Sequence, residues 1–314
     1  MAASYEEINY SLRPAKQIER KMICEAISRL SEFGTIETYR YIGLGSIYFS
    51  DFMLIHRKLN ISEMLSIEKD EHKKARFYFN RPFECINIEF GHSNKVLPTL
   101  DWDQRTVLWL DYDSRLNDGT LADICSFCAN AISGSMLIVT VNAHFAASEK
   151  DRLRQFRSTI ASERIPIQLE ESDLAGWAAA KSFRRIMTSA IEKFLQERNG
   201  TRSKGTRLGW KQVLSFEYAD GAKMTTLGGV IVDEGHEPQF NCCNFKALCF
   251  TQKTWEDSYR IDVPALTHRE LRYLDQRFPR SDVDGVETYE IPQRDVVNYL
   301  RLYRYFPNFS EIDL

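Results

Sequence analysis

Short runs of apolar residues alternate with amphipathic stretches through the first half of the chain. The apolar runs are continuous rather than interrupted at every second position, which is typical of strands buried on both faces of a parallel sheet. The stretches between them repeat apolar residues at helical spacing and predict covering helices. We therefore predict an α/β fold, with a Rossmann-like, doubly wound and mostly parallel sheet, whose strands span residues 39–44, 64–67, 84–90, 106–110 and 135–141.

The first of these units has the pattern of a nucleotide-binding turn. Gly43 and Gly45 flank Leu44 after the first apolar run, Ser46 is placed to start a helix, and the second run ends at Glu68. Glycines let the backbone approach a ligand closely, a helix N-terminus offers free N–H groups, and a carboxylate at the second strand's end can accept hydrogen bonds from ribose hydroxyls. The unit favours an adenosine-containing ligand. Two glycines are equally compatible with a plain turn between core strands.

The segment before this unit predicts a helix over residues 14–30, preceded by a loose arm over residues 1–12. The apolar residues of the predicted helix fall on one side, whereas Lys16, Arg20 and Lys21 fall on the other. We interpret the basic side as the solvated face of a covering helix rather than as an anion site.

The second half of the chain contains a clear hairpin signal after two further helical patterns, over residues 148–162 and 178–198. Two apolar runs, residues 213–218 and 223–232, flank a tip that contains Asp220 and Gly221. Asp-Gly is favoured in tight turns between antiparallel strands. Gly228 and Gly229 interrupt the second run and predict a bulge there.

The last part of the chain differs in character, because its apolar residues are sparser. We expect a strand over residues 245–250 and helices over residues 267–278 and 293–305, the first of which opens with a capping box of Thr267 and Glu270. The predicted division has three parts: an N-terminal helical arm (residues 1–35), a Rossmann domain (residues 36–232) and a C-terminal, α-rich extension (residues 233–314).

The composition indicates which classes of protein the chain does not resemble. The net charge of −3 argues against a surface coated with basic residues for nucleic acid. We expect no transmembrane segment and no signal peptide, and seven cysteines at irregular spacing favour a reducing, cytoplasmic location. Cys125 and Cys128 form a C-x-x-C without a second pair, inside a helical pattern, so we predict buried helix cysteines rather than a zinc or redox site.

Polar side chains follow the predicted strands at their carboxyl ends, where ligands bind in open α/β sheets. Asp111 and Asp113 follow the fourth strand, and Asn142 and His144 follow the fifth. These oxygens could hold Mg²⁺, but a metal site needs more ligands than this spacing provides, and we predict none. His144, like His92 after the third strand, is a candidate for a general base or for plain loop hydrogen bonding.

Five α/β units followed by an Asp-Gly hairpin resemble the class I S-adenosylmethionine (SAM)-dependent methyltransferase fold, over about residues 36–232. The chain is similar in particular to bacterial O-methyltransferase-like proteins and to methyltransferase-like partners encoded beside small proteins with a three-cysteine motif. The resemblance implies a reversed last strand in the sheet and SAM as the cofactor. It implies two groups of site residues: Gly43, Gly45, Ser46, Glu68 and His92 around the cofactor, and Asp111, Asp113 and His144 around the acceptor.

The resemblance implies a SAM-dependent, O-methyltransferase-like enzyme whose acceptor is unknown. The alternative is a catalytically silent, methyltransferase-like binding or regulatory subunit of a bacterial (antiviral) defence or nucleic-acid-modifying assembly. The hairpin after the fifth strand fits an NAD-type dehydrogenase less well. We expect a protein partner or a homodimer and no membrane contact, and a nucleic-acid acceptor is not favoured.

Overall fold

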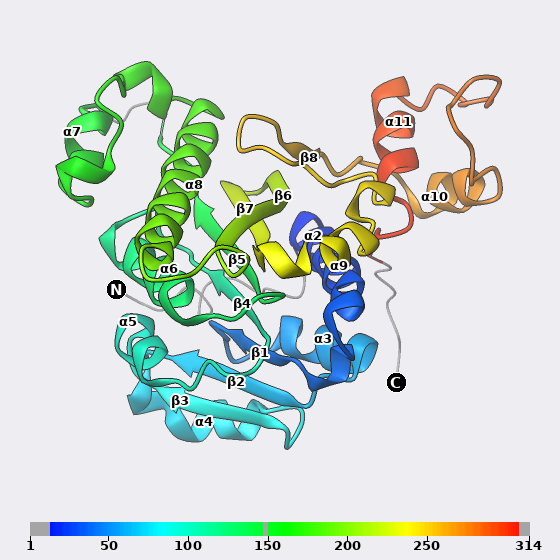
Figure 1. Ribbon diagram of the computed structural model, residues 1–314. Helices are drawn as coiled ribbons and strands as arrows, with labels where there is room; N and C mark the ends of the chain where they lie inside the picture. The colour runs from blue at the N-terminus through cyan, green and yellow to red at the C-terminus, as the bar shows by residue number, and fades with distance from the viewer. Residues whose placement is uncertain (1–12, 147–149, 308–314) are drawn as a thin grey trace.

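The computed structural model describes residues 13–146 and 150–307. Its centre is an eight-stranded sheet in the order β3-β2-β1-β4-β5-β7-β6-β8 (Figure 1). β1 to β5 run parallel, β7 is antiparallel to both β5 and β6, and β8 is parallel to β6. The predicted mostly parallel sheet with a reversed strand is confirmed. The strands are β1 Arg40–Gly43, β2 Glu63–Glu68, β3 Ile86–Phe90, β4 Thr106–Asp111, β5 Met136–Asn142, β6 Leu208–Asp220, β7 Ala222–Asp233 and β8 Tyr259–Ile261.

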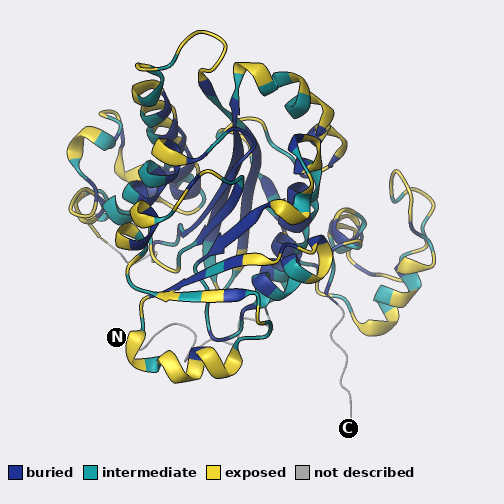
Figure 2. Ribbon diagram, turned by 60° about the horizontal axis from the view of Figure 1, so that its bottom comes forward, coloured by how far each residue is buried: buried dark blue, intermediate teal, exposed yellow. Residues whose placement is uncertain are grey.

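Two layers of helices cover the sheet, as Figure 2 shows by the buried strands between partly exposed helices. Successive residues of β4 point to opposite layers: Trp109 belongs to one apolar cluster, and Leu108 and Leu110 belong to the other. The Trp109 side includes residues of α2 (Pro14–Ser28), α3 (Ser50–Leu59) and α4 (Lys74–Asn80). The opposite side includes residues of α5 (Ser93–Val96), α6 (Asp118–Asn130), α7 (Arg152–Arg157) and α8 (Ala178–Asn199).

The first helix, α2, is packed into the core, and its polar side is buried too. Ile18 and Met22 are fully buried, as the apolar pattern predicts. Lys16 and Arg20, however, are only 1% and 5% exposed. The interpretation of this side as a solvated face was therefore wrong for these two residues. The physical reason is that Asp111 of β4 pairs with Lys16 and Asp51 of α3 lies near Arg20, and these partners are distant in sequence.

The helix after β1, α3, begins later than the sequence of the glycine turn predicted. α3 starts at Ser50 rather than at Ser46, and Phe49 before it adopts a left-handed conformation with φ of 45°. Phe49 is fully buried, so its aromatic side chain packs the turn against the core, and the helix begins only at the next residue. The helical pattern at 148–162 is also shorter than expected. α7 spans Arg152–Arg157, and residues 147–149 lie outside the described residues.

The predicted hairpin is confirmed, with Gly221 at its tip in a left-handed conformation (φ 99°). The bulge lies in β6, between Gln212 and Leu214, and not in β7 as predicted. The two glycines of β7 lie opposite it. A Cβ on Gly229 would come within 2.6 Å of both the Lys211 carbonyl oxygen and the Trp210 ring, so glycine there makes room for the partner strand.

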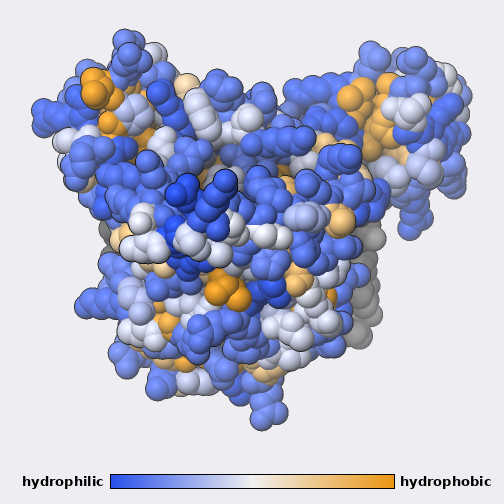
Figure 3. Space-filling view, in the orientation of Figure 1, coloured by the Kyte–Doolittle hydropathy of each residue, from blue (hydrophilic) through white to orange (hydrophobic). Residues whose placement is uncertain are grey.

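The C-terminal part contains one wrong prediction and one confirmed one. Residues 245–250 form no strand; a short 3₁₀ turn spans Phe245–Ala247, and the eighth strand lies further along as β8. The capping box at Thr267 is confirmed at the start of α10 (His268–Asp275), which packs with α11 (Gln293–Leu302) around a small apolar core. Figure 3 shows hydrophobic side chains on the projection formed by these helices. Within the described residues, no helix is both long and apolar enough to cross a membrane.

Candidate functional site

A cavity of about 420 Å³ opens at the carboxyl ends of β1 to β4, within the size range of small-molecule sites. Each of the four strand ends supplies wall residues, and α2 and α3 add Arg20 and Asp51. Six of the predicted site residues line it: Gly45, Ser46, Glu68, His92, Asp111 and Asp113. The other two, Gly43 and His144, are not among its lining residues.

Gly45 and Glu68 approach each other across the cavity wall. The Ser66 hydroxyl donates a hydrogen bond of 2.8 Å to Glu68 Oε1, and a Cβ on Gly45 would collide with both of these side chains. Glycine at position 45 is therefore needed for the carboxylate to lie where it does. Burial raises the pKa of Glu68 to about 8, against the opposing effect of the Ser66 hydrogen bond.

Gly43 lies behind the residues that line the cavity, where its lack of a side chain leaves space for a second carboxylate, that of Asp51. A Cβ on Gly43 would lie 3.2 Å from Asp51 Oδ2 and 3.1 Å from the Tyr41 hydroxyl, which donates to that same oxygen. Burial raises the pKa of Asp51, and the nearby Arg20 guanidinium lowers it. Sequence analysis missed Asp51, because a helix that starts at Ser46 would not place Asp51 in its first turn, whereas α3 starts at Ser50.

Asp123, which sequence analysis also missed, holds the part of the cavity wall next to His92. Ser93 and Tyr112 both line the cavity, and both hydroxyls donate to Asp123 Oδ2. Asp123 lies on α6 and is 1% exposed, and burial raises its pKa. His92 itself is exposed at the rim. The Asp123 carboxylate thus joins the ends of β3 and β4 through α6.

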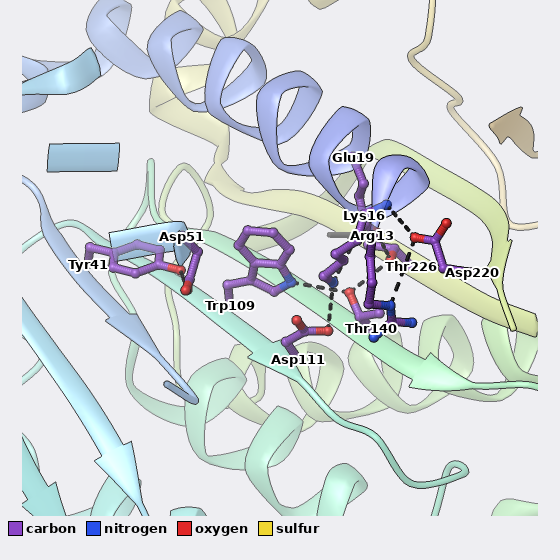
Figure 4. A network of polar contacts seen from close by, with 10 residues as sticks. All are labelled: Arg13, Lys16, Glu19, Tyr41, Asp51, Trp109, Asp111, Thr140, Asp220 and Thr226. Atoms are coloured by element: carbon purple, nitrogen blue, oxygen red, sulfur yellow. Dashed lines mark hydrogen bonds and ion pairs between the residues drawn. The ribbon is translucent and has the colours of Figure 1, made fainter. Parts of the chain in front are cut away.

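Asp111 is held by a buried ion network that reaches α2 (Figure 4). Lys16 Nζ lies 2.8 Å from Asp111 Oδ1 and 2.7 Å from Glu19 Oε2, and 4.8 Å from the Trp109 ring centre. Glu19 is fully buried and also accepts a hydrogen bond from Thr226 of β7. One ammonium group therefore serves two carboxylates, and it fixes the end of β4 against α2.

The hairpin caps the start of α2. Asp220, at the tip, accepts hydrogen bonds from the backbone N–H groups of Ala15 (3.2 Å) and Lys16 (2.9 Å). A carboxylate at this position satisfies N–H groups that a helix start leaves without intrahelical partners. The place of α2 beside the cavity is thus set by residues more than two hundred positions away.

Arg20, one turn further along α2, is a cavity-lining cation that sequence analysis left on a solvated face. The walls carry five carboxyl side chains and only two cations among the described residues, Arg20 and Lys69. Arg20 is 5% exposed, whereas Lys69 is an exposed residue. Arg20 is therefore the buried cation in an otherwise acidic cavity.

The end of β5 lies beside the cavity rather than in it. The His144 backbone N–H donates to Asn142 Oδ1 (2.7 Å), and its carbonyl accepts from Arg115 Nε (3.0 Å). His144 Nδ1 is buried without a hydrogen-bond partner among the described residues. Over the same residues, no cluster of three or more His, Cys, Asp or Glu side chains is arranged to hold a metal ion. Cys128 is buried and Cys125 half-buried in α6, and both are free.

Among curated proteins, no sequence matches. Trm1 from Pyrococcus horikoshii, solved with S-adenosyl-L-methionine, is 11% identical with a TM-score of 0.46, over 76% of this chain and 60% of that one. A "probable spermidine synthase" from Corynebacterium glutamicum is 10% identical with a TM-score of 0.44, over 80% and 82%.

The matches to several of these structures are partial. This chain spans 60%, 50% and 54% of the lengths of Trm1, of the methyltransferase SibL and of the mitomycin 7-O-methyltransferase MmcR. A family model, in contrast, matches residues 8–314, which is nearly the whole sequence. The chain belongs to the family that this model describes as "Putative O-methyltransferase".

Proposed function

We propose that this protein binds SAM in the cavity and transfers its methyl group to an acceptor held at the β4 and β5 ends. The observation that carries the proposal is the pairing of Gly45 with Glu68 in a cavity of about 420 Å³ at the carboxyl edge of the sheet. A carboxylate at the end of the second strand suits the ribose hydroxyls, and the family assignment supports the reaction class.

The residues present fit the chemical groups of SAM. Five cavity carboxyl groups suit a ligand that carries a sulfonium and an ammonium, and Arg20 offers a cation for its one carboxylate. The Gly45 and Ser46 backbone would lie along the ligand's amino-acid part, and Ser93 and Tyr112 would flank the base. His92 would lie at the rim of the base site.

SAM supplies an already activated methyl carbon, so the chain's main task is alignment. With SAM bound, its methyl group would pass to a lone pair of the acceptor and leave a neutral thioether, and the proton that the acceptor loses would pass to water or to a base of this chain. Asp113 lines the cavity at the β4 end and is the proposed proton acceptor. Asp111, held by Lys16, is proposed as a positioning residue. His144 stays a candidate only if the acceptor extends to β5.

Calorimetric titration with SAM, S-adenosylhomocysteine and NADH tests the proposal. Micromolar binding of the first two without NADH binding is the expected result. If the folded protein binds none of the three, the proposal is wrong. SAM binding without methyl transfer to small molecules, nucleic acid or protein would instead favour the silent-subunit alternative.

Gly45→Ala is expected to weaken SAM binding at least tenfold. Its new methyl group would meet the Ser66 hydroxyl and the Glu68 carboxylate, and the latter would have to leave its place. Gly91→Ala is the matched control, because that Cβ would lie 3.2 Å from Val96 Cγ2 in a milder contact at the same cavity. Calorimetric titration of both variants makes the comparison, and equal affinities would contradict the close approach.

Arg20→Met is expected to weaken binding of SAM about 10- to 100-fold while 5′-methylthioadenosine binds as in the wild type. Only SAM carries the carboxylate that Arg20 would hold, and a hydrogen bond to a charged group contributes about 1.5–3 kcal/mol. Lys69→Met, which removes the exposed cavity cation, is the control and should change either affinity less than threefold. Equal losses for the two ligands in Arg20→Met would mean general damage to the cavity and would refute the assignment.

A further inference from the structure

We propose that the methyl acceptor is carried by single-stranded nucleic acid, which binds on an aromatic and basic platform next to the cavity. This inference rests on the proposed methyltransferase function and names its substrate class. The platform consists of two tryptophans and four cations: Trp177, Trp255, Lys181, Arg185, Lys223 and Arg260.

Each tryptophan of the platform is paired with two cations. The Arg260 guanidinium carbon lies 4.4 Å from the Trp177 ring centre, and Lys223 Nζ lies 5.7 Å from it. Lys181 and Arg185, one turn apart on α8, lie 5.8 and 5.7 Å from Trp255. Both indoles are only partly buried, and Lys181 and Arg185 are exposed. The indoles therefore keep surface for stacking, next to charges that a phosphate can reach.

A buried ion pair holds both halves of the platform in place. Arg184, 1% exposed, donates to Glu217 Oε1 (2.8 Å), while Glu217 Oε2 accepts from Arg260 (2.6 Å). Arg184 Nε also donates to the Trp255 carbonyl oxygen (3.0 Å). The same guanidinium thus fixes the loop that carries Trp255 and, through Glu217, the arginine that lies over Trp177. Such support lowers the entropy cost of ordering these side chains on binding.

The Lys223 end of the platform lies at the carboxyl edge of the sheet, on the side of the cavity. Ser114 lines the cavity, and its carbonyl oxygen accepts from the Asn142 N–H at 3.0 Å. The next residue, Ala143, donates to the carbonyl oxygen of Lys223 at 2.8 Å. The path from the carboxyl end of β4 to Lys223, one of the two cations beside Trp177, therefore crosses only β5 and β7. A single-stranded nucleic acid bound on the platform could therefore extend across β7 and β5 toward the cavity.

Single-stranded nucleic acid matches this chemistry better than a duplex does. Bases that are not paired can stack on aromatic side chains, and nearby cations contact the phosphates. The net charge of −3, and the exposed Glu256 and Asp257 beside Trp255, limit the number of phosphates that the protein can neutralise. We therefore expect a short contact with a small dependence on salt, carried as much by stacking as by charge.

Fluorescence anisotropy with fluorescein-labelled 12-nucleotide RNA and DNA of mixed sequence tests the inference, at 50 to 200 mM salt. Single strands are expected to bind at least tenfold more tightly than the matching duplexes, and the RNA and DNA arms identify the preferred sugar. Lys181→Glu/Arg185→Glu should weaken binding at least tenfold and reduce the salt slope by about 1.4, since each phosphate contact to a single strand contributes about 0.7.

Trp177→Ala/Trp255→Ala should weaken binding about tenfold with the salt slope unchanged, which separates stacking from charge. Arg269→Glu/Arg272→Glu, an equal charge reversal on two exposed residues of α10, is the control and should stay within twofold of the wild type. Circular dichroism and SAM titration accompany every variant, so that loss of the fold or of the cofactor site is recognised separately from loss of the platform.

The inference would be overturned by no binding of either single strand at 50 mM salt, by equal weakening in the α10 control, or by a tryptophan variant that binds like the wild type. Tighter binding of polyglutamate than of the oligonucleotides would overturn it in favour of an acidic protein acceptor. If SAM itself does not bind but the single strands do, the platform stands as a nucleic-acid site, and the proposed methyltransferase function fails.

Discussion

Between pH 7 and pH 9, the affinity for SAM is expected to rise about tenfold more in the wild type than in Glu68→Gln. The pKa of Glu68 is raised to about 8 by burial, so about one tenth of the empty protein carries the carboxylate at pH 7. Binding that requires the anion to accept both ribose hydroxyls is weakened by that fraction. At pH 9, Glu68→Gln should bind SAM about 10- to 100-fold more weakly than the wild type, because it loses charge-assisted hydrogen bonds.

Calorimetric titrations of both proteins at pH 7, 8 and 9 test this. The ammonium of SAM also titrates near pH 8, but equally for both proteins, so the difference between their slopes isolates Glu68. A wild-type affinity whose pH dependence is parallel to that of the variant would refute the role of Glu68.

The same carboxyl group affects stability, with a definite sign. Its folded pKa of about 8 lies above the ordinary value of 4.5, so the folded state holds the proton more tightly. The contribution of this proton to the free energy of unfolding is therefore complete below pH 4.5 and is lost as the pH rises through 8. In urea unfolding, the free energy of unfolding should decrease less between pH 5 and pH 9 for Glu68→Gln than for the wild type.

Lys16→Met is expected to lower the free energy of unfolding by about 3–5 kcal/mol, the range for breaking a buried ion pair by removing one partner. Lys16 Nζ lies within 2.8 Å of both Glu19 and Asp111 carboxylates, and Glu19 is fully buried. Without the ammonium, Glu19 must be buried as an uncompensated charge or take up a proton.

The double variant Lys16→Met/Glu19→Gln is the matched control, since it also removes the buried charge of Glu19 that Lys16→Met leaves without its ammonium partner. It should recover a large part of the lost stability in urea unfolding at pH 7. A single variant as stable as the wild type would show that the ammonium is not needed, and a double variant no better than the single one would assign the loss to packing alone.

The parts of the fold that sequence analysis predicted well depend on local patterns. The apolar runs of β1 to β5 need no partner to be recognised, and the Asp-Gly tip of the hairpin and the capping box at Thr267 are chemical signals within four residues. The cavity residues Gly45, Ser46 and Glu68 follow from the same local logic, because they occupy strand ends.

The parts that could not be predicted depend on contacts between distant segments. The helical pattern of α2 separates apolar from polar positions, but a polar position is buried when a partner arrives from elsewhere, as Asp111 does for Lys16. The bulge in β6 is equally non-local, because the glycines that allow it lie on β7. Asp123 and Tyr112 meet only after α6 has folded over β4.

The capping of α2 by the hairpin has a consequence for how the protein is made. Asp220 is 204 residues beyond the Lys16 N–H that it binds, and Thr226 is 207 residues beyond Glu19. While the chain is being synthesised, β1 to β5 can pair as they emerge, but α2 has neither its cap nor the complete partner set for its buried charges. The cavity wall that Arg20 forms is therefore finished only after β7 leaves the ribosome. We therefore expect the complete ligand-binding cavity to form only late in synthesis.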